Sequence, residues 1–250
     1  MHPLDVGAVT HRGMVRAVNE DGILAVPPVF VVADGIGGAR GGATASSLVV
    51  EQFAILAQRE PIRPDDVRHA LEEAHAHVRA LHQQSLPGAG TTACGAVAVE
   101  LDREPHWFVF NIGDSRIYRT EGEDRSLVQL SVDHSHVQEL VDAGAITAAQ
   151  AAVHPGRNLV TRAVGSEEQF DPDFWLLPMV PGERLLICSD GLLREVPLAT
   201  VQDVVRRAES AQAVVDHLLD LSLRAGARDN VSVIMVEVGR ERAAEDGSGR

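Results

Sequence analysis

The chain has 250 residues, a length that suits one large domain or two small ones and that allows a real hydrophobic core. Its formal net charge of −14 argues against a role in nucleic-acid binding, because an acidic surface repels the phosphate backbone. All 22 basic residues are arginine, and the lack of lysine excludes P-loop ATPases, ordinary protein kinases and Schiff-base enzymes.

The lack of targeting signals in the sequence and the two predicted free cysteines point to the same compartment. The sequence has no run of 18 apolar residues and no basic start followed by an apolar stretch, so we expect no membrane span and no signal peptide. Cys94 and Cys188 each lie in an apolar, strand-like run and are predicted to be buried free thiols. These features together indicate a cytoplasmic protein, where thiols stay reduced.

Apolar runs of strand length and stretches of helical periodicity follow one another irregularly along the chain. In chain order, the predicted strands cover residues 23–26, 29–33, 93–99, 107–112, 116–119, 127–130, 185–189 and 231–238. The predicted helices cover residues 42–58, 64–84, 135–143, 198–209 and 211–225. Because strands outnumber helices and do not alternate with them one for one, we expect antiparallel sheets covered by helices rather than a doubly wound parallel sheet.

The chain shows no internal repeat and no long low-complexity stretch, so residues 1–240 are interpreted as a single domain. Residues 134–165 interrupt the strand pattern and are predicted to form a helical insert over one end of the sheet. Residues 241–250 are polar and are predicted to be a disordered tail.

Acidic residues at strand ends or glycine turns are the strongest chemical signal. They are Glu20, Asp21, Asp34, Asp114, Asp190 and Asp229. Carboxylates at strand ends converge at one edge of a sheet, and oxygen ligands select Mg²⁺ or Mn²⁺ over zinc. An isolated Asp-Gly pair is usually a turn, but an apolar strand runs directly into Asp34 and Asp190. A carboxylate at the end of a buried strand needs partners, and the glycine after it lets the backbone approach a metal closely.

The glycine-rich stretch 35–42, GIGGARGG, precedes a predicted helix. Such a stretch can cradle a phosphate at the start of a helix, but this one lacks the lysine of a P-loop. We therefore interpret it as a flexible turn before the helix.

Taken together and in order, seven segments resemble the metal-dependent serine/threonine protein phosphatases of type 2C, or PPM family, and most of all its bacterial members that oppose eukaryotic-like kinases. The segments are RGMVRAVNED (12–21), ADGIGG with GGATAS (33–47), GTTACGAV (90–97), NIGDSRIY (111–118), the insert from HSHVQELVDAGAIT to HPGRNLVTRAVG (134–165), CSDGL (188–192) and RDNVSV (228–233). The resemblance covers about residues 4–238.

The resemblance implies an α+β fold, with a central antiparallel β-sandwich flanked by helices on both sides and a helical flap. It implies that two Mn²⁺ or Mg²⁺ ions activate a water molecule that attacks the phosphate. By this resemblance, Asp34 bridges both ions, and Asp190 and Asp229 complete the first site. Glu20 and the carbonyl of Gly35 serve the second site.

The resemblance also assigns roles around these ions. Asp114 with Asp190 forms a third, weaker metal site, and Asp21 orients the attacking water. Arg16 grips the substrate phosphate, a role to which a bidentate guanidinium is suited. An alternative for Arg16 is a surface ion pair with Glu20 or Asp21. Residues 134–165 are the flap that shapes substrate access.

One position departs from part of the family. Some animal members carry a histidine where this chain has Ile36, and that histidine is thought to protonate the leaving group. Bacterial relatives usually have an apolar residue there, so the departure leaves the general acid unassigned rather than the activity in doubt.

The expected partners are phosphorylated proteins, including a Ser/Thr kinase and its substrates, and the expected state is a monomer. Three alternatives stay open. One is a catalytically inactive binding module, although all the metal-ligating carboxylates are present, and another is a partner-switching regulator of the same fold. The third is a general metal-binding hydrolase that acts on small phosphate esters.

Overall fold

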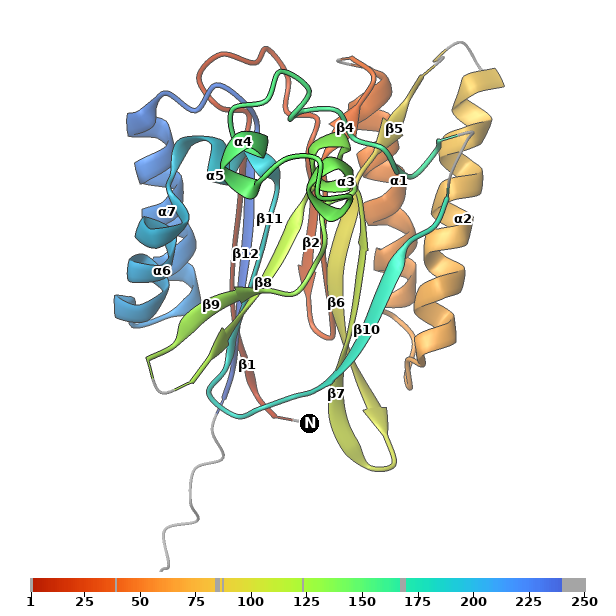
Figure 1. Cartoon of the computed structure of the whole chain (residues 1–250). Helices are drawn as coiled ribbons and strands as arrows, with labels where there is room; N and C mark the ends of the chain where they lie inside the picture. The colour runs from red at the N-terminus through yellow and green to blue at the C-terminus, as the bar shows by residue number, and fades with distance from the viewer. Residues whose placement is uncertain are drawn as a thin grey trace, which may run out of the picture.

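Two five-stranded antiparallel sheets pack face to face at the centre of the molecule, between two layers of helices (Figure 1). The computed structural model describes residues 2–38, 40–83, 86, 88–122, 124–166 and 170–239. The arrangement confirms the expected α+β class and its order of layers, helix, sheet, sheet, helix. The predicted tail at 241–250 lies outside the described residues.

The chain crosses repeatedly between the two sheets. The first sheet has the order β1 (Leu4–His11), β12 (Val231–Val238), β11 (Arg184–Cys188), β8 (Arg116–Glu121) and β9 (Ser126–Gln129). The second has the order β10 (Asp173–Pro178), β7 (Glu104–Ile112), β6 (Ala93–Leu101), β3 (Val29–Ala33) and β2 (Gly22–Val26). A short pair, β4 (Gly35–Ile36) with β5 (Gly90–Thr91), follows the end of β3. Every strand pair in these sheets is antiparallel.

Helices cover the outer face of each sheet (Figure 1). The second sheet packs against α1 (Gly41–Leu56) and α2 (Pro64–Gln83), and the first against α5 (Asp190–Glu195), α6 (Leu198–Arg207) and α7 (Ala211–Ala225). Two short helices, α3 (His136–Asp142) and α4 (Ala148–Ala151), lie over one end of the sandwich. None of the described helices combines the length and apolar character needed to cross a membrane.

Side chains alternate between the two faces of a strand, and this explains how one strand contributes to two hydrophobic cores. In β3, Val29 and Val31 pack in the core beneath α1 and α2, whereas Phe30 and Val32 point into the core between the sheets. All four side chains are fully buried. Because successive side chains point to opposite faces, a strand covered on both sides appears in the sequence as a continuous apolar run.

All eight predicted strands and five predicted helices are present, most within two residues of the predicted bounds and β6 and β7 two or three residues longer. Residues 134–165 contain α3 and α4, and bridges between Ser135 and Val160 and between Thr91 and Val164 tie this segment to itself and to β5. Cys94 and Cys188 are free and buried, as predicted.

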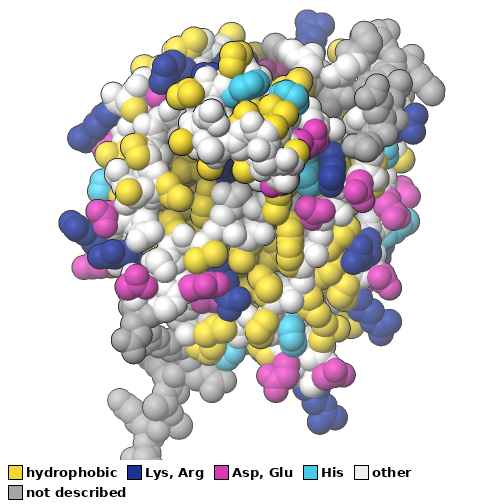
Figure 2. Space-filling view, in the orientation of Figure 1, with side chains coloured by type: hydrophobic (Ala, Val, Ile, Leu, Met, Phe, Trp, Pro, Cys, Tyr) yellow, Lys and Arg dark blue, Asp and Glu magenta, His cyan; other side chains and the backbone are white. Residues whose placement is uncertain are grey.

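The sequence did not predict β1, β4, β5, β10, α4 or α5. Strands β9 and β10 are edge strands, and Val128 in β9 and Leu176 in β10 expose 39% and 47% of their surface. Figure 2 shows apolar side chains gathered on this face, beneath α3 and α4. An edge strand that is buried on one side only carries a weaker apolar signal than a central strand.

Candidate active site

The residues singled out from the sequence come together in a cleft of about 1010 Å³ at one end of the sandwich. The described lining includes seven of them, namely Arg16, Glu20, Asp34, Gly35, Asp114, Asp190 and Asp229. The eighth, Asp21, lies behind them. The structure therefore gathers positions that are up to about 210 residues apart in the sequence.

Strand ends from both sheets deliver the acidic side chains. Asp34 follows β3, and its backbone N–H donates to Thr92 Oγ1 at 2.9 Å while its carbonyl accepts from the Thr92 N–H at 2.8 Å. Asp190 begins α5 two residues after β11, and Asp229 stands two residues before β12. Asp114 follows β7 through Gly113, whose φ of 113° favours glycine.

Buried carboxylates crowd one another in the cleft. Burial raises the pKa of Asp114 to about 7 and that of Asp190 to about 6, and neighbouring carboxylates add to both shifts. Burial also raises the pKa of Asp34, with further contributions from Asp21, Asp190, Asp114 and Asp229. Carboxylates in this state favour either a bound proton or a bound cation.

Asp21 is held in place by two hydroxyl groups. Its Oδ2 accepts from Ser189 Oγ at 2.9 Å and from Ser232 Oγ at 2.7 Å, and these serines come from two neighbouring strand ends. Burial raises the pKa of Asp21 to about 6, although the two hydrogen bonds act in the opposite direction. The other carboxylate oxygen, Oδ1, is buried and has no hydrogen-bond partner in the described part of the chain.

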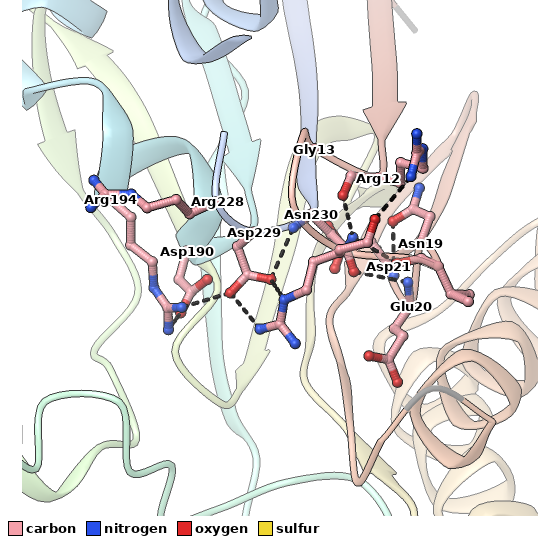
Figure 3. A network of polar contacts seen from close by, with 12 residues as sticks. Arg12, Gly13, Asn19, Glu20, Asp21, Asp190, Arg194, Arg228, Asp229 and Asn230 are labelled. Carbon is pink, nitrogen blue, oxygen red and sulfur yellow. Dashed lines mark hydrogen bonds and ion pairs between the residues drawn. The ribbon is translucent and has the colours of Figure 1, made fainter. Parts of the chain in front are cut away.

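Two arginines converge on Asp229. Arg16 contacts it through Nε at 2.8 Å and Nη2 at 2.9 Å, and Arg194 contacts it through Nη1 at 2.7 Å. Arg194 also forms an ion pair with Asp190 (Figure 3). Arg16 is therefore paired with Asp229 rather than with Glu20 or Asp21, the partners considered from the sequence.

Glycines let the backbone close around Glu20. A Cβ at Gly35 would lie 2.5 Å from the carbonyl carbon of Gly42, and a Cβ at Gly42 would lie 2.6 Å from Glu20 Oε1. Glu20 Oε1 is buried and has no hydrogen-bond partner among the described residues, and in Figure 3 no dashed line joins its carboxylate to the arginines. The glycine-rich stretch thus serves close approach at the start of α1 rather than a phosphate cradle.

The donor set fits a hard divalent cation. It consists of carboxylate oxygens together with the Gly35 backbone, and one of these oxygens, Glu20 Oε1, is buried and has no hydrogen-bond partner among the described residues. Such oxygens suit Mg²⁺ or Mn²⁺. As they stand, no three Asp, Glu, His or Cys side chains among the described residues form a group that could hold an ion. Asp190 and Asp229 instead form ion pairs with arginines.

Sequence reasoning missed two residues at the centre of this network, Arg194 and Asn230. Arg194 stands four residues after Asp190, a spacing that brings side chains together on a helix and that could have been noticed. Asn230 Oδ1 accepts from the Glu20 N–H at 2.9 Å, and its Nδ2 donates to the carbonyls of Arg12 and Val18. No local pattern reveals these contacts, because they join residues more than 200 positions apart.

A second cavity of about 720 Å³ opens beside the cleft, beneath α3 and α4. The two share part of their lining, including Arg16, Asp114, Asn158, Asp190, Arg194 and Asp229. The insert at 134–165 contributes to both walls, so any group bound at the acidic cluster lies against this segment.

Comparisons with known proteins agree with this geometry. A family model described as protein phosphatase 2C matches residues 17–230. The serine/threonine phosphatase Stp of Listeria welshimeri is 32% identical over an alignment of 254 positions, gaps included. The alignment covers 96% of this chain and 98% of that protein. The serine/threonine protein phosphatase PstP of Mycobacterium tuberculosis is 36% identical over 241 residues, which cover 94% of this chain but only 45% of PstP.

Solved structures give the same result. A crystal structure of M. tuberculosis PstP superposes with a TM-score of 0.87 at 32% identity and covers 95% of this chain and 99% of that one. The catalytic domain of PstP in complex with two manganese ions gives a TM-score of 0.84 at 30% identity, with 95% and 99% of the two chains covered. With the matched family model, which spans most of the chain, these similarities show that the chain belongs to the protein phosphatase 2C family.

Proposed function

We propose that this chain is a metal-dependent phosphatase that removes phosphate from phosphoserine and phosphothreonine in proteins. The observation that carries the proposal is the convergence of acidic side chains from both sheets, with Arg16, in one cleft. Two divalent cations, Mn²⁺ or Mg²⁺, would supply a nucleophilic water at neutral pH and neutralise charge on the phosphoryl oxygens. The chain's own residues bind, orient and hold the reacting groups.

For the metal ligands we propose two core sites and a third, weaker one. Asp34 is shared by the core sites, and Asp190 and Asp229 complete the first of them. Glu20 and the Gly35 carbonyl belong to the second. Asp114, with Asp190, belongs to the weaker third site. The buried, unpartnered oxygen of Glu20 and the raised pKa of Asp34 and Asp114 support a cation in their midst.

For the phosphate we propose Arg16. Its side chain is 48% exposed at the cleft, and its contacts with Asp229 use two of the five N–H donors of a guanidinium. Arg16→Ala should raise KM by about tenfold with a smaller fall in kcat, because a grip on the phosphate is mostly uniform binding. A fall in kcat at constant KM would assign Arg16 to the transition state instead.

For Asp21 we propose that it orients the attacking water through its free Oδ1, while Ser189 and Ser232 hold Oδ2. We further propose that residues 134–165 act as the flap over the substrate, and that residues 1–240 form one domain. The flap is supported by the walls of the two cavities, since α3 and α4 line the smaller one and residues 158–163 line the larger one. The single domain is supported by the pairing of the first strand, β1, with the last, β12.

The biological setting is also a proposal. We propose that the chain acts as a monomer in the cytoplasm and opposes a Ser/Thr kinase by dephosphorylating it and its substrates. The relatives named as Ser/Thr phosphatases support the part of this setting that concerns action on phosphoproteins. The full set of carboxylates argues against an inactive module of the same fold.

The direct test is phosphate release from a phosphothreonine peptide and from p-nitrophenyl phosphate. We expect activity with Mn²⁺, none in EDTA, and a loss of nearly all activity in Asp190→Asn. The matched control is Asp220→Asn, which removes an exposed carboxylate paired with Arg224 at the same i,i+4 spacing on α7. Full activity in Asp190→Asn, or activity in EDTA, would contradict the proposed site.

A further inference from the structure

Arg194 joins the two acidic residues that come from the first sheet. Its Nη2 pairs with Asp190 Oδ2 and its Nη1 lies 2.7 Å from Asp229 Oδ2, so one guanidinium spans both carboxylates (Figure 3). The three side chains are 36%, 19% and 17% exposed, which places this bridge at the wall of the cleft rather than on the open surface. Partly buried ion pairs are screened less than surface ones.

The acceptor capacity of Asp229 is fully used. Its Oδ1 accepts from Arg16 Nε at 2.8 Å and from the Asn230 N–H at 2.9 Å. Its Oδ2 accepts from Arg16 Nη2 at 2.9 Å and from Arg194 Nη1 at 2.7 Å. A carboxylate offers about four acceptor sites, so a cation can bind Asp229 only if one of these donors leaves.

Local structure keeps Arg194 close to its partners. Asp190 and Arg194 are four residues apart on α5, with the acidic residue on the N-terminal side, which is the favourable order for such a pair. Arg16 lies instead on the loop between β1 and β2 and contacts only Asp229 of these two carboxylates. Arg194 is therefore the positive charge that bears on both carboxylates at once.

From this geometry we propose that Arg194 is an internal counter-ion that competes with a divalent cation for Asp190 and Asp229, and thereby weakens metal binding by this chain. The inference rests on the metal site of the proposed function. Binding a cation at Asp229 requires one of its donors to withdraw, and Arg194 is the donor that also holds Asp190. Its positive charge remains nearby after withdrawal and still repels the ion. Both effects act in the same direction, so removing the charge should tighten metal binding.

The test is calorimetric titration of Mn²⁺ into the full chain after EDTA treatment and dialysis. We expect Arg194→Gln to bind the first Mn²⁺ equivalent about tenfold more tightly than the wild type. Arg194→Lys keeps the charge but loses the fork that spans two carboxylates, so its affinity should fall between the two. The matched control is Arg224→Gln, because Arg224 makes the same i,i+4 pair with Asp220 and neither residue lines the cleft, so its affinity should not change.

Thermal unfolding gives a second readout that does not depend on catalysis. In EDTA, Arg194→Gln should lower the Tm by about 2–4 °C, because Asp190 and Asp229 lose a partner. With saturating Mn²⁺ this deficit should disappear or reverse, because tighter binding stabilises the folded state more. A variant that only damaged the fold would keep the deficit in both conditions.

Unchanged or weaker Mn²⁺ binding in Arg194→Gln would overturn the proposal, and weaker binding would show that Arg194 positions the carboxylates for the metal. If Arg194→Gln does not fold, Arg194→Lys decides the same question by the direction of its change in affinity. Binding is measured without substrate, so a chain that binds Mn²⁺ as expected but hydrolyses no phosphoprotein would contradict the proposed function and leave this inference standing.

Discussion

The two sheets contribute differently charged halves to one cleft. From the first sheet, Asp190 and Asp229 are held by arginines. Beside the second sheet, Asp34 and Glu20 form no ion pair within the described part of the chain, and the pKa of both is raised, first by burial. One half thus carries its own positive charge, whereas the other depends on a proton or a cation from solution. The same residue type can therefore be stabilising in one half and costly in the other.

The largest expected effect is on activity, which should depend on the carboxylates of the cleft and not on those of the remaining surface. We expect Asp34→Asn to lower kcat/KM at saturating Mn²⁺ by at least about a thousandfold, because it removes the carboxylate that both cations would share. Asp220→Asn on α7 should leave kcat/KM within about twofold of the wild type. Retention of activity in Asp34→Asn would mean that the unpaired half of the cleft is not where chemistry occurs.

The tight backbone around Glu20 gives a smaller effect in the same half. Gly42→Ala would place a Cβ 2.6 Å from Glu20 Oε1 and 2.8 Å from the Gly35 carbonyl carbon, so backbone has to move. We expect a loss of about 10- to 100-fold in kcat/KM. Gly41→Ala is the control, since its nearest contact is the Ala89 Cβ at 3.2 Å and alanine favours a helix. Equal effects in both variants would contradict the close-approach argument.

Stability measured in EDTA should move in opposite directions in the two halves. Asp34→Asn removes a half-buried carboxylate that has no ion-pair partner among the described residues and whose charged form is disfavoured, and we expect a rise in Tm of about 2–4 °C. Asp229→Asn takes a shared partner from Arg16 and Arg194, and we expect a fall of similar size. Thermal scans of both variants check this, and shifts of the same sign would erase the distinction between the halves.

A change of pH should have the smallest effect on stability. The folded pKa values of Asp21, Asp114 and Asp190, about 6, 7 and 6, lie above the ordinary value of an aspartate. Such groups bind protons more tightly when folded, so their contribution to stability is full at low pH and is lost as pH rises through about 6 to 7. In EDTA we expect a higher Tm at pH 5 than at pH 8. Mn²⁺ should remove this difference, and a Tm that rises with pH in EDTA would contradict it.

Much of the fold and the site could be predicted because both depend on strong local patterns. The buried strand β3 is a continuous apolar run and β12 is apolar from Val233 to Val236, and an acidic residue stands next to several such strands. Strand β1 escaped prediction because its residues are mostly half-buried, and its one buried position is Gly7, where a Cβ would lie 2.4 Å from Ala211. Helix α5 is only six residues long, too short for a periodic signal.

The unpredicted part of the site is the part built from long-range contacts. The i,i+4 relation between Asp190 and Arg194 is visible in the sequence, but the reach of Arg194 to Asp229 is not. The same holds for Asn230, which fastens the Glu20 segment from more than 200 residues away. Spacing predicts which side chains share a helix face, whereas only the packing of two sheets decides which loops meet.

The position of β12 has a consequence for the folding of the protein during its synthesis. This late strand lies between β1 and β11 and directly follows Asp229 and Asn230. The earliest strand, β1, therefore has no pairing partner until β12 has been synthesised. Until residue 238 has left the ribosome, β12 cannot pair with its neighbours. The growing chain then holds neither the Glu20 loop nor the pair Asp190 and Asp229 in place. Competence to bind metal should therefore appear abruptly, once translation of β12 is complete, and not gradually with chain length.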